Sequence, residues 1–215
     1  MATKDRILDA ATELFNQATV AEVSTNHIAE AAGISPGNLY YHYKNKEMII
    51  RAILERMFAT FGELWVLPEG RQLTLEDLHD LLTRLFTLLW RFRFFDREQL
   101  SLLRRDPLLA ARYQEIQVQR LGEQARYFQK YIDDGVLVFD NPDHFRSIIT
   151  ACWILSNNWL SFVETGGETV QPDHIQQGID MIFVVIRPYL AELYQHALAH
   201  VSPAHADLDK DVFYD

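Results

Sequence analysis

The chain has 215 residues, 48% of them apolar, and its 20 lysines and arginines face 30 aspartates and glutamates, which gives a formal net charge of -10. The apolar content suffices for a sizeable core, whereas the acidic balance argues against a protein that coats nucleic acid through bulk positive charge. The single cysteine excludes an intrachain disulfide, and no apolar run approaches the ~20 residues that a membrane helix needs, so we expect a cytoplasmic protein without a membrane partner.

The first two helices follow from apolar spacing and capping residues. Apolar side chains recur at helical spacing from Asp5 to Gln17, which predicts an amphipathic helix. A short second helix follows Ser24, whose hydroxyl can cap its start. Gly33 can adopt the left-handed conformation that ends this helix.

Two further helix starts lie close behind. Ser35 can cap a third helix with Pro36 in its first position, where the missing N–H costs nothing. Asn45 can cap a fourth helix that runs to about Trp65. Two short helices joined by a glycine-containing turn and braced by a preceding helix are the helix-turn-helix arrangement, whose second helix enters the major groove of DNA.

The segment between Glu30 and Glu47 carries groups that bind DNA phosphates. Its only charged side chains are Lys44 and Lys46, and His42 and several tyrosines accompany them. Phenol, imidazole and ammonium groups all donate hydrogen bonds to phosphate oxygens. Because the rest of the chain is acidic, we expect contact with DNA to be confined to this region.

The remainder reads as helix almost throughout, after a linker of proline and glycine at residues 66–74. Further helix starts are predicted at Thr74, Asp96 and Asp106, and two more helices at residues 142–165 and 172–200. In the stretch RFRFFDRE at residues 91–98, we expect phenylalanines to turn inward and Arg97 to remain solvated. The sequence predicts an all-α protein of about nine helices.

Three stretches of the first 50 residues resemble the DNA-binding domain of the TetR family of bacterial transcriptional regulators. They are "ILDAATELF", "STNHIAEAAGIS" and "GNLYYHYKNKEMI", in the order and at the separations usual in that family. The resemblance implies a three-helix DNA-binding domain at residues 1–47 and a larger helical domain for effector binding and dimerisation at residues 48–201. We expect residues 202–215 to form a flexible acidic tail.

The resemblance also implies which residues contact DNA. Positions that meet base edges or the nearby backbone are Thr25, Asn26, Pro36, Gly37, Asn38 and Tyr41. Positions that meet phosphates are Tyr40, His42 and Lys46. An asparagine amide can pair bidentately with adenine, so Asn26 and Asn38 are suited to reading bases. Tyr43, which shares a helical face with Leu39, is expected in the core.

A ligand pocket is expected in the larger domain. Three polar residues, Ser156, Asn157 and Asn158, interrupt the apolar stretch "CWILSNNWLSF". Buried amides need hydrogen-bond partners, which either a ligand or a facing subunit can provide. The residues expected to line a pocket for an apolar or aromatic effector are Phe61, Trp65, Phe86, Trp90, Tyr127, Trp153 and Asn157.

Dimerisation is expected because palindromic operators are read by two-fold symmetric proteins. The last two predicted helices carry apolar residues at helical spacing, which can form half of an intersubunit four-helix bundle. The residues expected at this interface are Trp159, Phe162, Ile175, Ile179, Ile182, Ile186 and Tyr189. The alternative is that this stripe packs entirely within the chain.

Catalytic and metal chemistry find little support in the sequence. It contains no phosphate-binding glycine loop, zinc-protease motif or nucleophile elbow, so we expect neither an enzyme nor a cofactor. His196 and His200 lie four residues apart but lack a carboxylate-rich partner motif, and we expect no metal site. The predicted function is that of a repressor that a small molecule releases from a palindromic operator; the alternative is a DNA-bound factor that recruits another protein and binds no small molecule.

Overall fold

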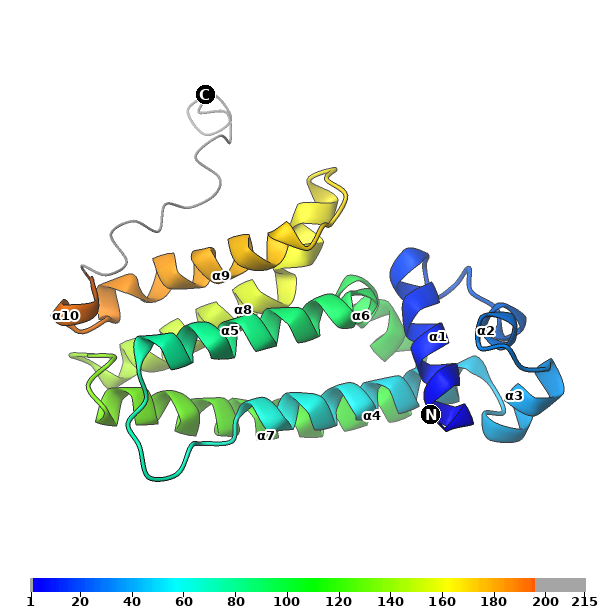
Figure 1. Ribbon diagram of the computed structural model, residues 1–215, viewed down its shortest axis with the longest axis horizontal. Coiled ribbons are helices and arrows are strands. Elements are labelled where there is room, and N and C mark those ends of the chain that lie inside the picture. The colour runs from blue at the N-terminus through cyan, green and yellow to red at the C-terminus, as the bar shows by residue number, and fades with distance from the viewer. Residues whose placement is uncertain (1, 196–215) are drawn as a thin grey trace. The chain divides into compact units, whose positions relative to one another are not determined.

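The computed structural model describes residues 2–195, and every regular element in this part of the chain is helical. An isolated antiparallel bridge joins Leu137 and Leu190. The prediction of an all-α fold is confirmed. The helices (Figure 1) are α1 Thr3–Gln17, α2 Thr25–Ala31, α3 Pro36–His42, α4 Lys46–Leu64, α5 Leu75–Arg91, α6 Arg93–Arg105, α7 Pro107–Asp133, α8 Pro142–Thr165, α9 Asp173–Ile186, the short 3-10 helix η1 Arg187–Tyr189 and α10 Glu192–Gln195.

The capping residues at the N-terminal end of the chain act as predicted. The hydroxyl of Ser24 accepts from the N–H of His27, and that of Ser35 accepts from the N–H of Asn38. Gly33 has a φ of 65°, which glycine adopts without the steric cost that a side chain brings. These local interactions fix both ends of the short helix α2 and the start of α3.

Two predicted helix boundaries are wrong. Asp96 does not start a helix but lies in the first turn of α6, which begins at Arg93. The last predicted helix does not continue through Pro188: α9 ends at Ile186, and η1 and α10 follow. Proline lacks the N–H that a continuing helix requires, and its ring collides with the preceding turn.

The chain divides into two compact units. Unit 1 comprises residues 1–64 and 91–121, and unit 2 comprises residues 65–90 and the chain from residue 122 onward. Unit 1 therefore contains the helix-turn-helix together with α4, α6 and the first half of α7. In this division, segments distant in the sequence join the N-terminal helices. The expected functional division at residues 47 and 48 stays a prediction.

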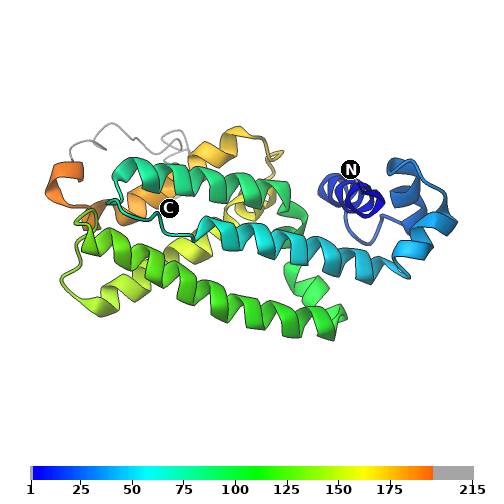
Figure 2. The same ribbon diagram turned by 60° about the horizontal axis from the view of Figure 1, so that its bottom comes forward.

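The core of unit 1 is built around α1, which Figure 2 shows almost along its axis. This helix packs against α2, α4 and α6. Phe15 is fully buried at its end, where its ring lies 5.3 Å from that of Phe94 on α6. Tyr43 is 7% exposed, which confirms its predicted place in the core.

Unit 2 includes α8 and α9, which lie side by side (Figure 1). Gly178 on α9 makes their close packing possible. A Cβ atom at this position would lie 2.3 Å from Phe86 Cε1 and 2.7 Å from Trp159 Cδ1, so no side chain fits between these two rings. Within residues 2–195, no helix combines the length and apolar character needed to cross a membrane.

Candidate DNA-binding surface and its support

A side chain of α1 stabilises the turn between α2 and α3. The guanidinium of Arg6 donates to the carbonyl oxygens of Ala32 and Gly33, at the C-terminal end of α2. Cationic donors are favourable at this end of a helix, where the last carbonyls lack helical partners. Ile28 and Leu39 are fully buried, so the opposite faces of α2 and α3 are left for solvent.

Most of the residues expected to meet DNA lie on α2 and α3, and Lys46 lies at the start of α4. Asn26, Pro36, Gly37, Asn38, Tyr40 and Tyr41 are exposed, whereas Thr25, His42 and Lys46 are partly buried. The hydroxyls of Thr25 and Tyr40 are hydrogen-bonded to each other at 3.0 Å, which joins the start of α2 to the middle of α3. The arrangement presents amides, hydroxyls and an exposed glycine together on one surface.

Lys46 has a role that the sequence did not indicate. Its ammonium group donates to the carbonyl oxygens of Val20 at 2.5 Å and Val23 at 2.8 Å, so it fastens the loop between α1 and α2 to the start of α4. An ammonium group has three N–H donors. Two are therefore engaged within the protein, and a phosphate contact by the third remains a prediction.

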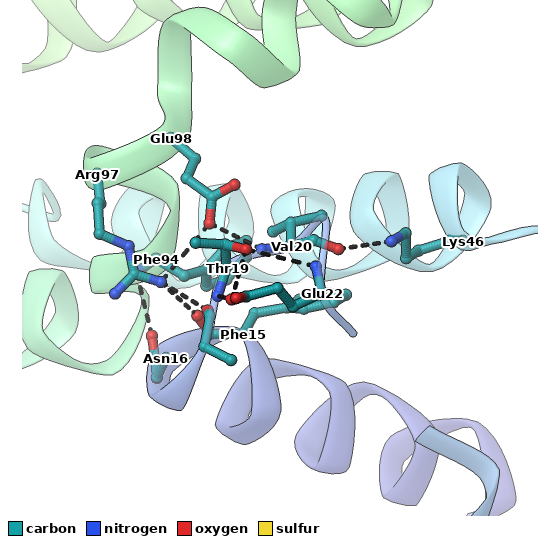
Figure 3. Close-up of polar contacts among 10 residues, drawn as sticks. Phe15, Asn16, Thr19, Val20, Glu22, Lys46, Phe94, Arg97 and Glu98 are labelled. Atoms are coloured by element: carbon teal, nitrogen blue, oxygen red, sulfur yellow. Dashed lines mark hydrogen bonds and ion pairs between the residues drawn. The ribbon is translucent and has the colours of Figure 1, made fainter. Parts of the chain in front are cut away.

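The C-terminal end of α1 is bonded to α6 through side chains (Figure 3). Arg97 donates to the carbonyl oxygens of Phe15 and Ala18, both at 2.7 Å, and Glu98 accepts from the N–H of Val20 at 2.8 Å. The expectation that Arg97 remains solvated is wrong. Its guanidinium instead satisfies carbonyl groups that have no partner within α1.

Asn16 completes this contact from the side of α1. Its amide nitrogen donates to the carbonyl oxygen of Arg91, and its amide oxygen accepts from the N–H of Phe94. One side chain thus bridges the break between α5 and α6. Sequence patterns do not reveal these partners, because each bond joins residues more than 70 positions apart.

A partly exposed ion pair connects α4 to the start of α7 within unit 1. Arg51 Nε lies 2.6 Å from Asp106 Oδ2, while Asp106 Oδ1 accepts from the N–H groups of Leu108 and Leu109 and so caps α7 as predicted. Burial works to raise the pKa of Asp106, but these bonds together hold the pKa below its ordinary value. The carboxylate therefore stays charged and fixes α7 to α4.

The structure brings together only some of the residues expected to line a ligand pocket. Trp65 and Tyr127 meet edge to face with ring centroids 5.7 Å apart. Phe86 is instead packed beside Gly178. Phe61 belongs to unit 1, where the guanidinium of Arg120 lies 3.8 Å from its ring centroid. Trp90, Trp153 and Asn157 are partly buried in unit 2.

The polar residues within α8 find partners in their own helix. The hydroxyl of Ser156 and the amide of Asn157 donate to the carbonyl oxygen of Trp153, and the amide of Asn158 donates to that of Ile154. These donors therefore need neither a ligand nor a facing subunit. Such bonds to the preceding turn are a common solution for polar side chains in helices.

A cavity of about 430 Å³ lies in unit 2. It is bordered by α5, by α7 and by the segment that follows α4. Its apolar lining comes from Val66, Leu67, Pro68 and Leu81, and Tyr127 contributes an aromatic wall. Arg71, Asp77, Asp80, Thr83 and Arg84 supply polar groups. Tyr127 is the one residue of the predicted pocket that lines it.

Some of the residues predicted at the dimer interface are buried within the single chain, and others are exposed. Trp159, Ile179, Ile182 and Ile186 are at most 5% exposed in the single chain, so they have no surface left for a partner. For these side chains the alternative of packing within the chain holds. Phe162 is 63% exposed, and Ile175 and Tyr189 are partly buried.

Metal and thiol chemistry have no visible site in the part of the chain that the structure describes. Residues 2–195 contain no group of three or more potential ligands from His, Cys, Asp and Glu that could hold a metal ion. His196 and His200, like the predicted tail, lie outside the described residues. Cys152 is buried, which raises the pKa of its thiol to about 12 and keeps it protonated.

Comparison with known proteins places both parts of the chain in one family. Residues 7–53 match the model of "Bacterial regulatory proteins, tetR family", and residues 56–198 match that of "Bacterial transcriptional repressor". The chain belongs to the TetR family. It is therefore a DNA-binding transcriptional regulator and not an enzyme.

Relatives in the TetR family support this assignment over different lengths. The chain is 40% identical to the regulator AcrR of Shigella flexneri over 62 residues, which cover 29% of each protein. It is 42% identical to UidR of Escherichia coli K12 over 65 residues, or 28% of this chain and 33% of UidR. The matched part thus spans about a third or less of these curated relatives.

Solved structures of TetR-family proteins match over nearly the whole chain. A regulator from Marinobacter aquaeolei VT8 is 35% identical, with a TM-score of 0.82 over 91% of this chain and 95% of that one. The structure of the SmeT–triclosan complex has a TM-score of 0.60 over 89% of this chain and 93% of SmeT, at 21% identity, which shows the shared fold alone. SmeT is a repressor of a multidrug efflux pump of Stenotrophomonas maltophilia.

Proposed function

We propose that this protein is a cytoplasmic, homodimeric repressor that binds a palindromic operator and is released from it by an apolar or aromatic small molecule. The observation that carries the proposal is the outer face of α2 and α3. It presents Asn26, Gly37, Asn38 and Tyr41 to solvent on a buried apolar base. Amides and hydroxyls on a helix N-terminus are suited to base edges and phosphates in the major groove.

Two copies are needed to hold DNA with so few cations. The chain carries a formal charge of -10, and the helix-turn-helix offers only Lys44 and Lys46 between Glu30 and Glu47. Each phosphate contact contributes a share of the salt-dependent affinity, so a single helix-turn-helix binds DNA weakly. A two-fold dimer doubles these contacts and places two helix-turn-helix units in major grooves about 34 Å apart along the DNA.

The dimer surface is proposed on the uncovered faces of α8 and α9. Ile154 and Phe162 on α8 and Val184 on α9 are 56%, 63% and 43% exposed, although all three are large and apolar. Apolar residues exposed on two neighbouring helices are typical of an association surface. Phe162→Glu is expected to give monomers in light scattering after gel filtration, and a dimeric variant would exclude this surface.

Release from DNA is proposed to pass through α6. In unit 1, Arg97, Glu98 and Asn16 fasten α6 to the end of α1, on which the helix-turn-helix is built. The chain enters unit 1 at residue 91 directly from α5 of unit 2. An effector that binds unit 2 more tightly in one conformation of the dimer shifts the population toward that conformation, and so changes the fraction of dimers that fit the operator.

The test begins with selection of operator sequences from genomic fragments by the purified protein. Compounds that raise the melting temperature of the dimer are then added to the protein–operator complex in a mobility assay. Compounds that stabilise the dimer and release DNA support the proposal, and the triclosan bound by SmeT is a first compound to try. Stabilising compounds that leave the complex intact would favour the alternative of a DNA-bound factor that recruits another protein.

A further inference from the structure

A second cavity, much smaller than the first, lies within unit 1 beside the loop between α1 and α2. Its volume is about 70 Å³, and all the residues that line it belong to unit 1. An engineered apolar cavity of about 150 Å³ holds benzene, so the space here is enough for roughly three or four carbon atoms. Its buried apolar lining consists of Val20, Ile50, Leu102 and Leu109, each at most 7% exposed. The cavity therefore suits a short aliphatic group and is too small for an aromatic ring.

Five charged residues also line this cavity, and three of them are already bonded within the protein. Asp106 uses both carboxylate oxygens, one for Arg51 and the other for backbone N–H groups. The ammonium of Lys46 donates to two carbonyl oxygens of the loop, which leaves one of its three N–H groups. Glu98 accepts from the loop (Figure 3) and meets Arg97 through the same oxygen, Oε1. Lys46 thus retains one donor, and Glu98 retains one carboxylate oxygen.

The other two charged residues of the lining are Glu47 and Arg105. Both side chains are exposed, and among residues 2–195 neither takes part in a hydrogen bond or an ion pair. They have opposite charges and line the same small cavity, yet they do not pair with each other. A molecule that carries both charges can bind between them through charge-assisted hydrogen bonds.

The unused hydrogen-bonding groups of the cavity are balanced in sign. Arg105 and Lys46 can donate, whereas Glu47 and Glu98 can accept. A simple anion would bring its charge next to the two carboxylates, and a simple cation would bring its charge next to the guanidinium and the ammonium. A zwitterion with a short apolar part matches both the charges and the apolar lining.

We propose that this cavity binds a free α-amino acid with a short branched aliphatic side chain. The carboxylate of the ligand accepts from Arg105 and Lys46, and its ammonium group donates to Glu47 and Glu98. The side chain fills the apolar part of the cavity. Lys46 and Glu98 also bond to the loop before α2, so the site is connected to the helix-turn-helix. This inference goes beyond the proposed function, whose effector binds in unit 2.

The first test measures binding by calorimetry with L-valine and two analogues that each lack one charge, valinamide and 3-methylbutanoate. L-valine is expected to bind with a Kd of about 1 mM or less. Each analogue should bind roughly three- to tenfold more weakly, because it loses one partly exposed charged contact. L-phenylalanine and glycine should also bind more weakly, since one side chain is too large for the cavity and the other leaves it empty. No saturable binding of L-valine, or equal binding of L-valine and either analogue, overturns the proposal.

The second test assigns the two charges of the ligand to residues. Arg105→Gln should remove most of the preference for L-valine over valinamide, and Glu47→Gln most of the preference for L-valine over 3-methylbutanoate. Both side chains are exposed, so the variants should fold. Arg104→Gln on α6 and Glu63→Gln on α4 are the matched controls, because they are also exposed but do not line the cavity. The controls should bind like the wild type, and equal losses in controls and test variants would refute the assigned site.

Thermal unfolding gives an independent readout of the same site. L-valine at about ten times its Kd should raise the melting temperature of the wild type and of both controls, because a ligand that binds the folded state stabilises it. Arg105→Gln and Glu47→Gln should show a smaller rise, and an equal rise in all five proteins would contradict the proposal. Because the effector cavity belongs to unit 2, failure of these tests would leave the proposed release from DNA untouched.

Discussion

Gly37 offers a sharp test of the DNA-binding surface, because no contact among the described residues requires a glycine there. It lies exposed in the first turn of α3, and its φ is not in the positive range that favours glycine. Among the described residues, no atom lies within 4 Å of the position that a Cβ would occupy. The remaining reason for a glycine is close approach by an external molecule, and the proposed DNA provides one.

Gly37→Ala is therefore expected to change stability and DNA binding in opposite directions. Where the backbone conformation suits alanine, replacing glycine stabilises a protein by about 0.4–1 kcal/mol, because the unfolded chain loses freedom. The new methyl group should weaken DNA binding by about 1–3 kcal/mol at each half-site. For a dimer on a palindrome, two half-sites lose at least about 2 kcal/mol together, which corresponds to a loss of affinity of at least roughly thirtyfold.

The assay compares Gly37→Ala with Gly122→Ala in thermal unfolding and in fluorescence titration of labelled operator. Gly122 is an exposed glycine of α7, and a Cβ there also meets no described atom within 4 Å. Both variants should be as stable as the wild type or more stable, and only Gly37→Ala should lose DNA affinity. Wild-type affinity in a folded Gly37→Ala protein would exclude a close approach of DNA to residue 37.

Three other substitutions test separate features of the structure. Gly178→Ala should lower the free energy of unfolding by about 1–3 kcal/mol in denaturant titration, since its Cβ would lie 2.3 Å from Phe86 Cε1; an unchanged midpoint would disprove this packing. Burial raises the pKa of Asp96 to about 8, against the opposing charge of Arg120, so the folded state binds this proton more tightly than the unfolded state. The free energy of unfolding should then fall by up to about 1.4 kcal/mol per pH unit as the pH rises from 5 to 8. Asp96→Asn should flatten this slope. Parallel pH profiles of wild type and variant would contradict the raised pKa of Asp96. Lys46→Ala should destabilise unit 1 and lower the salt dependence of operator binding by roughly one unit of slope, whereas a stability loss with an unchanged slope would show that its ammonium serves the fold alone.

Local features of the N-terminal helices were predictable from the sequence because they depend on neighbouring residues. Ser24, Ser35 and Gly33 do what their types and positions indicate, since a cap or a left-handed turn involves residues only a few positions apart. The outward position of Tyr41 and the inward position of Tyr43 follow in the same way from helical periodicity. The family resemblance of the first 50 residues rests on these same local patterns.

The ligand-pocket and dimer residues stay predictions, because helical periodicity shows that a stripe is apolar but not what covers it. Ile179, Ile182 and Ile186 form such a stripe, and the chain itself buries them. In α8, the amide of Asn157 looked like a group in need of a partner, yet the preceding turn supplies one. Sequence spacing alone does not distinguish these outcomes.

The residue pattern alone was enough to predict most helix boundaries, the all-α fold and a helix-turn-helix that carries amides and hydroxyls. Only the tertiary structure showed that Asn16 and Arg97 join α1 to α6, that the ammonium of Lys46 holds a loop, and that Glu47 and Arg105 line one small cavity. The physical reason is distance along the chain. Caps and turns are decided by neighbours in sequence, whereas burial and long-range hydrogen bonds depend on which distant segments meet when the chain packs.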